Sequence, residues 1–157
     1  MNKECNLNSK ESEKTFKPTS RRDIRCLAFY LLYAIDRFDY SVSLEQMIEN
    51  FRSGFNIDIL TDSFAIEMVD GVIKNKEDID KKMAPFLKNW RIERLGCCTR
   101  LILRLAIWEI LNKKVALSVV INEAIELAKT FAEKDAYKFV NGILDELCKK
   151  MNFSEKN

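Results

Sequence analysis

Two groups of side chains in this sequence have the chemistry needed to bind an anionic partner. Arg21, Arg22 and Arg25 lie within one helical turn near the start of the chain, and Lys138 stands beside Phe139 far along it. Guanidinium groups attract phosphates, and a cation next to an aromatic residue in a helical segment is not needed for packing. The alternative is that the arginines form only a solvated face and that Phe139 belongs to the core.

The chain lacks the groups that most catalytic or metal sites require. It contains no histidine, which removes the commonest general base and the commonest metal ligand, and it has no CxxC pair. There is also no P-loop, GxGxxG or GxSxG motif. Acidic pairs such as Asp78 and Asp80 are expected on a solvated helix surface. We therefore predict a binding protein that is not an enzyme and has no catalytic residue, cofactor or metal.

The charges are unevenly distributed along the chain, although the net charge is only +2. Residues 26–80 contain four basic and eleven acidic side chains, whereas residues 81–114 contain nine basic and two acidic ones. A phosphate-binding surface would need such positive blocks, provided that folding brings them together with the N-terminal arginines. Solvated faces account for the same pattern. Arg100 and Arg104 are at least as well explained by pairing with Glu93, Glu109 or the acidic side chains of residues 58–80.

The composition predicts an all-α fold. Only four glycines and two prolines occur, and long runs are rich in Leu, Ala, Glu, Lys and Ile. Apolar residues recur at helical spacing in about seven segments. We expect helices over about 21–37 with Ser20 as cap, 43–52 with Ser43 and Gln46 as a capping box and Gly54 as stop, 62–74, 76–86, and 90–112 with an irregularity at Gly96. Two more helices are expected to have Ser118 and Asp135 as N-caps.

Gly142 lies inside the last of these helices. A glycine there costs about 1 kcal/mol relative to alanine, so we expect it to permit the close approach of another backbone.

The domain organisation is predicted to be simple. Residues 1–19 are polar and are expected to form a disordered leader, residues 20–150 one helical domain, and residues 151–157 a frayed tail. The sequence contains no run of eighteen apolar residues, so no transmembrane helix is expected, and the N-terminus lacks the apolar core of a secretory signal. A cytoplasmic location is therefore expected.

The two C-terminal helical segments carry a specific resemblance. INEAIELAK from Ile121 and KFVNGILD from Lys138 resemble the signature of the NusB family of bacterial transcription antitermination factors. Three further segments support the resemblance in the right order, RRDIR from Arg21, MVDGV from Met68 and LRLAIWE from Leu103. The resemblance covers roughly residues 20–148 and implies an all-α fold of two packed antiparallel bundles.

The resemblance also implies a function. Family members bind a boxA sequence of nascent, single-stranded RNA together with the ribosomal protein NusE, in antitermination and in ribosomal RNA synthesis. The positions that would contact RNA are Arg21, Arg22, Arg25, Asp135, Lys138 and Phe139. Tyr33 matches a tyrosine near the NusE interface, and Thr99 stands where a glutamate is common on the NusE-facing side. The other partner expected is the transcription elongation complex, and a homodimer stays open because some relatives form dimers.

Two hypotheses follow from these residues. The first is an RNA-binding antitermination factor in which the arginines and Phe139 share one open face. The second is a non-catalytic protein-interaction module related to the N-terminal domain of ribosomal RNA cytosine methyltransferases. Sequence-selective RNA recognition mostly uses unstacked single strands, which favours the first.

Overall fold

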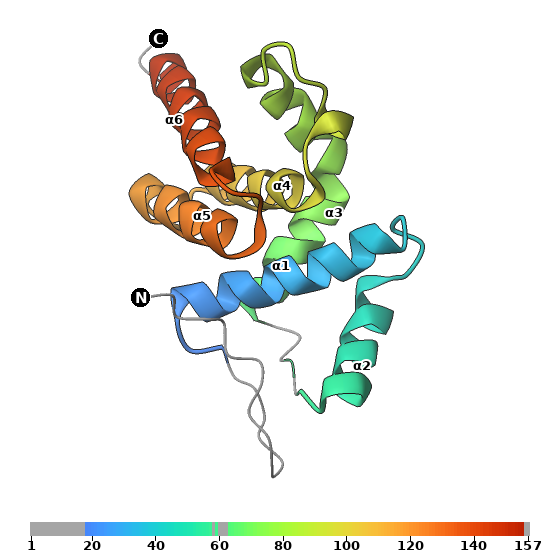
Figure 1. Cartoon of the computed structure of the whole chain (residues 1–157). Coiled ribbons are helices and arrows are strands. Elements are labelled where there is room, and N and C mark those ends of the chain that lie inside the picture. The colour runs from blue at the N-terminus through green and yellow to red at the C-terminus, as the bar shows by residue number, and fades with distance from the viewer. Residues whose placement is uncertain (1–17, 58, 60–62, 156–157) are drawn as a thin grey trace. The chain divides into compact units, whose positions relative to one another are not determined.

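The structure, a computed structural model, describes residues 18–57, 59 and 63–155, with the side chains of 153–155 left aside (Figure 1). All regular structure in these residues is helical, which confirms the all-α prediction. The chain divides after Asp70 into two compact units. The α-helices are α1 (Arg21–Arg37), α2 (Leu44–Phe55), α3 (Phe64–Met83), α4 (Cys97–Asn112), α5 (Leu117–Phe131) and α6 (Ala136–Glu155), and the short 3-10 helices are η1 (Ala84–Phe86) and η2 (Ile92–Arg94).

The first unit is built on the packing of α1 against α2. Both predicted N-caps are confirmed, but the full capping box forms only at Ser20, because the Gln46 side chain donates to Asn50 at 3.0 Å. The Ser20 hydroxyl accepts from the backbone N–H of Asp23 at 3.0 Å while the Asp23 carboxylate accepts from the Ser20 N–H at 3.3 Å. Ser43 accepts from the N–H of Gln46 at 3.1 Å. These bonds satisfy backbone donors that the first helical turn leaves without partners.

The end of α2 differs from the prediction. The helix continues through Gly54 to Phe55, and Asn56 takes the left-handed conformation with φ of 50°. Asparagine tolerates this conformation because its short polar side chain can hydrogen-bond locally. The expected stop at Gly54 was therefore wrong by two residues.

The two helices expected over 62–74 and 76–86 are both present, and they join at a kink within α3. Its backbone leaves helical geometry only at Asn75, where φ is −114° and ψ is 16°. The Asn75 side-chain amide donates to the carbonyl of Gly71 at 2.7 Å, so that carbonyl keeps a partner across the kink. The described residues contain six α-helices, of which α3 holds two of the predicted segments, in agreement with the expected number of about seven.

The second unit is organised around α4, which contacts both α5 and α6, while α5 and α6 also contact each other (Figure 1). Every residue from Leu101 to Ile107 is buried. One of them is charged: Arg104 pairs with both carboxylate oxygens of Asp80, each at 2.8 Å. This pair confirms the alternative in which Arg104 meets the acidic residues of 58–80.

Other helix boundaries in this unit also differ from those predicted. The fifth helix begins at Leu117 after Ala116, which supplies no side-chain cap, so Ser118 does not start it. The irregularity expected at Gly96 is confirmed: α4 begins at Cys97 with Gly96 as its N-cap, and η2 forms separately before it. The sixth helix continues to Glu155, into the predicted tail. Within the described part of the chain, every helix is too short or too polar to cross a bilayer.

Gly71 is required by close packing. A Cβ atom at this position would overlap the indole ring of Trp108 on α4. We expect Gly71→Ala to lower the free energy of unfolding by about 1–3 kcal/mol, because the indole or the helix must shift to admit the methyl group. Urea unfolding followed by circular dichroism measures this loss.

Gly54→Ala is the matched control. A Cβ at this helical position meets nothing within 4 Å. This variant should gain about 0.5–1 kcal/mol, because alanine is the better helix former. Equal effects of the two substitutions would contradict the packing role of Gly71.

Candidate nucleic-acid interface

The three arginines at the start of α1 are not equivalent. Arg21 is exposed, Arg22 is half-buried, and Arg25 is buried with only 4% of its surface exposed. The Nη1 atom of Arg25 donates to the backbone carbonyl of Arg21 at 3.0 Å. Asp23 adds a negative charge to this first turn, where the helix dipole stabilises it. Arg21 is thus the guanidinium that is open to a partner from solvent.

The start of α6 carries the second group of predicted residues. Asp135 immediately precedes the helix and has a positive φ of 67°. Its carboxylate lies 3.5 Å from the ammonium group of Lys138, and both side chains are more than half exposed. An ion pair so exposed contributes little and leaves Lys138 accessible to other anions. Phe139 is half-buried, so its ring is not sealed in the core.

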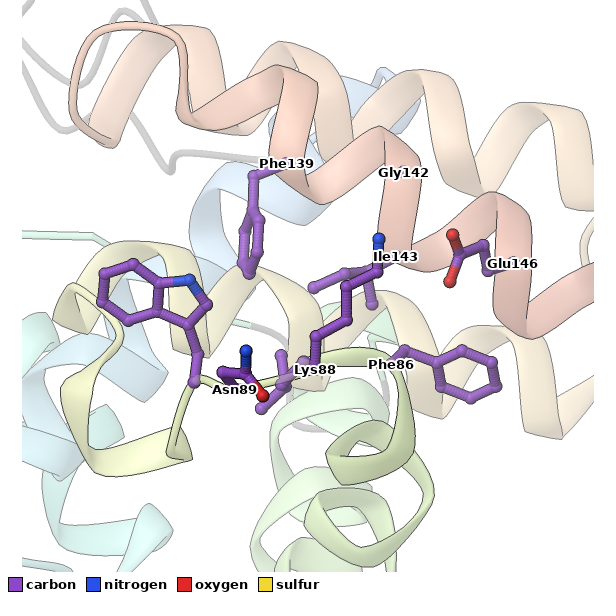
Figure 2. Close-up of a pocket in the computed structure, with 9 residues that line it drawn as sticks. Phe86, Lys88, Asn89, Phe139, Gly142, Ile143 and Glu146 are labelled. Atoms are coloured by element: carbon purple, nitrogen blue, oxygen red, sulfur yellow. The ribbon is translucent and has the colours of Figure 1, made fainter.

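Phe139 lines a pocket in the second unit. The ring faces the segment that follows η1, across a hollow of about 400 Å³ (Figure 2). Trp90, whose side chain is 61% exposed, also lines it. From α6 come Phe139, Gly142, Ile143 and Glu146, and from the other side come Phe86, Leu87, Lys88, Asn89 and Trp90.

Gly142 has a different role from the one expected. A Cβ built on it meets nothing within 4 Å, so no backbone approaches it closely. The glycine instead leaves the α6 side of the pocket open (Figure 2). The expectation of close backbone packing is therefore wrong, although its helical position was correct.

The segment opposite α6 is held by one buried anchor. Leu87 is 1% exposed, and its carbonyl accepts from the N–H of Trp90 at 3.0 Å. Between them Lys88 takes a left-handed conformation with φ of 54°. This turn exposes Lys88, Asn89 and Trp90, which sequence reasoning had not selected. The available signal was the helix-breaking Pro85, since residues shortly after a helix end often lie in a loop.

The two residues expected near a protein partner differ in exposure. Tyr33 is 38% exposed, with its ring centroid 6.0 Å from that of Phe29. Thr99 is buried at 4% exposure, and its hydroxyl donates to Glu133 at 3.1 Å. Its side chain therefore has an internal partner, and the nearby group that solvent reaches is the exposed Glu133.

Glu133 lies at the N-terminus of α4. A Cβ built on Gly96, the N-cap residue, would overlap the Glu133 carboxylate. The helix has no side-chain cap of its own, so a carboxylate from the α5–α6 connection stabilises the positive end of its dipole. Burial raises the pKa of the Cys98 thiol, and the negative charge of Glu133 raises it further.

The α1 arginines belong to the first unit and Phe139 to the second. The structure describes each unit by itself, so the predicted common face of arginines and Phe139 stays a prediction.

Comparison with known proteins identifies this helical architecture. Thermotoga maritima NusB is similar in structure, with a TM-score of 0.73 and 34% identity, over 85% of this chain and 93% of that one. A chain in a crystal structure of antitermination factors NusB and NusE in complex with double-stranded RNA is also similar, with a TM-score of 0.70 and 29% identity, over 83% and 96% of the two chains. The class of protein is thus that of small helical NusB-like proteins.

The sequence comparisons agree with the structural ones. The NusB family model matches residues 22–149. The transcription antitermination protein NusB of Macrococcus caseolyticus is 38% identical over 130 residues, which cover 83% of this chain and 97% of the relative. That of Geotalea daltonii is 40% identical over 136 residues, covering 82% and 94%. The chain belongs to the NusB family.

Replacing the Glu133 charge should change the reactivity of Cys98. In a Cys97→Ser background, Glu133→Gln should lower the pKa of the Cys98 thiol, because one of the two causes that raise it is removed. A larger thiolate fraction at pH 8 should then speed alkylation by iodoacetamide. Peptide mass spectrometry measures the rate, with Glu126→Gln on α5 as control. An unchanged rate would contradict the placement of Glu133 beside α4.

Proposed function

We propose that this chain is an RNA-binding transcription antitermination factor that binds boxA-type single-stranded RNA together with ribosomal protein NusE and supports ribosomal RNA transcription. The observation that carries the proposal is the exposed aromatic pocket at Phe139, next to the accessible Lys138. Membership of the NusB family supports it, as does the similar chain that was solved with NusE and RNA. In this proposal the chain is not a catalyst, is located in the cytoplasm, and acts at the transcription elongation complex.

The physical requirements of this function are met in both units. Single-stranded RNA needs cations for its phosphates and aromatic rings for its bases. Arg21 on α1 and Lys138 on α6 supply exposed cations, while Phe139 supplies a ring. Arg22 and Arg25 are more buried, so we assign them the role of shaping the start of α1 around Arg21. Asp135 lies beside Lys138 at the start of α6, with 3.5 Å between their charged groups.

The decisive experiment is a titration of the full chain with a boxA-type oligonucleotide, with and without NusE, at two salt concentrations. We expect tighter binding with NusE and weaker binding at higher salt. Binding releases counterions from the RNA, and this release contributes less free energy when the salt concentration is higher. An unrelated RNA of equal length that binds as tightly would overturn the proposal. RNA binding that is only nonspecific, with NusE binding retained, would favour the protein-interaction module instead.

Arg21→Ala should flatten the salt dependence of RNA binding. Loss of one phosphate contact on a single strand lowers the slope of log affinity against log salt by about 0.7. Arg37→Ala is the matched control, because Arg37 is exposed at the opposite end of α1. If both variants keep the wild-type slope, Arg21 does not contact phosphate.

The NusE contact is proposed to use Tyr33 and the Thr99–Glu133 pair. Family members commonly present a glutamate at the position of Thr99. Here the Thr99 hydroxyl donates to Glu133, so a carboxylate from the α5–α6 connection stands beside position 99. Glu133 thereby supplies the negative charge that Thr99 lacks.

This substitution of one carboxylate by another can be tested with a reciprocal swap. Glu133→Gln, which keeps an acceptor for Thr99, should weaken NusE binding about fivefold, equivalent to roughly 1 kcal/mol. The double variant Glu133→Ala, Thr99→Glu should recover the affinity, since a glutamate in the first turn of α4 also suits the helix dipole. Calorimetric titration with NusE measures both. Wild-type affinity for Glu133→Gln would refute the role of its charge.

A further inference from the structure

We propose that the pocket between α6 and residues 86–90 holds one unstacked nucleobase, with Trp90 and Phe139 as its aromatic walls and Glu146 selecting bases that carry an exocyclic amino group. The inference rests on the proposed RNA-binding function and gives it a specific subsite. All residues concerned lie in the second unit.

The size and walls of the pocket suit a single base. Its volume of about 400 Å³ lies in the lower part of the range for small-molecule sites, and its lining combines rings with a few polar groups. Phe139 reaches down from α6 toward the segment that carries Asn89, and Ile143 adds an apolar surface between them (Figure 2). Because Gly142 has no side chain, a flat ring can enter beside α6 without meeting a Cβ.

Trp90 is a large aromatic residue that the fold leaves exposed. Its indole is 61% exposed, whereas Trp108 packs against Gly71. Leu87 anchors the turn in the core, so the exposure of Trp90 comes from a fixed backbone. A large aromatic ring that is exposed next to a buried anchor is suited to base stacking.

The charged groups of the pocket have complementary uses. Lys88 and Glu146 both line it, but they do not form an ion pair with each other. The Lys88 ammonium is available to a phosphate, and Figure 2 shows its side chain directed across the pocket toward α6. The Glu146 carboxylate only accepts hydrogen bonds, so it favours an exocyclic amino group of cytosine, adenine or guanine over the carbonyl oxygen that uracil presents at the corresponding position, although the uracil N3–H is also a donor.

A second hollow gives the rest of the nucleotide chain a path. Phe86 borders both hollows, and the second is also lined by Lys81, Lys82 and Lys150. The Lys150 ammonium lies 5.6 Å from the Phe86 ring centroid. Phosphates next to the captured base would therefore meet lysines along the same side of α6.

Tryptophan fluorescence tests the site directly. The full chain is titrated with a single-stranded boxA-type oligonucleotide, and the emission of Trp90→Phe is subtracted from that of the wild type to isolate the Trp90 signal. We expect that signal to be quenched as RNA binds, because stacking on a base quenches an indole. An unchanged Trp90 signal at saturating RNA would overturn the proposal.

Affinity measurements on three variants complete the test. Trp90→Ala should weaken RNA binding roughly 5- to 150-fold, as expected for one lost stacking partner, while Trp90→Phe should retain most of the affinity. Phe55→Ala is the matched control, because Phe55 is 68% exposed on α2 and lies outside the pocket. Equal affinity of Trp90→Ala and the wild type would refute the stacking role.

The base preference is tested by single replacements in the oligonucleotide. Uridine in place of each amino-bearing base in turn should weaken wild-type binding most at one position. Glu146→Gln should reduce that penalty, whereas Glu77→Gln on the exposed surface of α3 should not. A penalty that Glu146→Gln leaves unchanged would refute the selecting role of Glu146. RNA binding that depends on Arg21 but on neither Trp90 nor Glu146 would refute this inference and leave the proposed function standing. Absence of any RNA binding would refute both.

Discussion

The pairing of Arg104 with Asp80 is the constraint on which the second unit depends. The Arg104 side chain is only 7% exposed, on a helix whose neighbouring residues are buried, so its charge must have a partner. Both oxygens of Asp80 bind it, and this fork joins the C-terminal half of α3 to the central α4. Since α3 leads directly into η1, the same pair places the chain that follows.

The consequences extend from that pair to the pocket. The η1 segment contacts α6, and Leu87 is buried immediately after it. The next three residues are therefore exposed by a turn with a fixed start. On the opposite side, Val140, Ile143, Leu144 and Leu147 bury one face of α6. Phe139, at the edge of that face, is left half-buried, so a pocket forms where neither element can close on the other.

Local features of the sequence predicted much of this fold. Ser20 and Ser43 cap their helices because a cap depends on residues three positions apart. The core positions of α4, α5 and α6 were also predictable, because the helical spacing of apolar residues is a local feature of the sequence. The break between residues 74 and 76 was predicted as well, whereas only the structure shows the Asn75 amide donating to the carbonyl one turn earlier. The stop at Asn56 rather than Gly54 likewise depended on which residue took the left-handed conformation.

The candidate site was less accessible to sequence reasoning. Spacing placed Arg21 and Arg25 on one helical face, but only the structure distinguishes the exposed guanidinium from the buried one. Trp90 could not be assigned to the pocket, because its opposing residues are about fifty positions away in α6. The residues around Trp90 in the sequence do not indicate that Gly142 of α6 lines the same pocket.

The contact between Thr99 and Glu133 brings a carboxylate to the start of α4 from a distant part of the sequence. The two residues are thirty-four positions apart, yet the Glu133 carboxylate reaches the first turn of α4, where a negative charge is favoured by the helix dipole. A small side chain at position 96 is required for this, because any Cβ there would meet the same carboxylate. A family pattern read position by position records a missing glutamate at Thr99. The electrostatic requirement at the start of α4 is nevertheless met, because the field at a helix terminus depends on where a charge lies and not on which residue carries it.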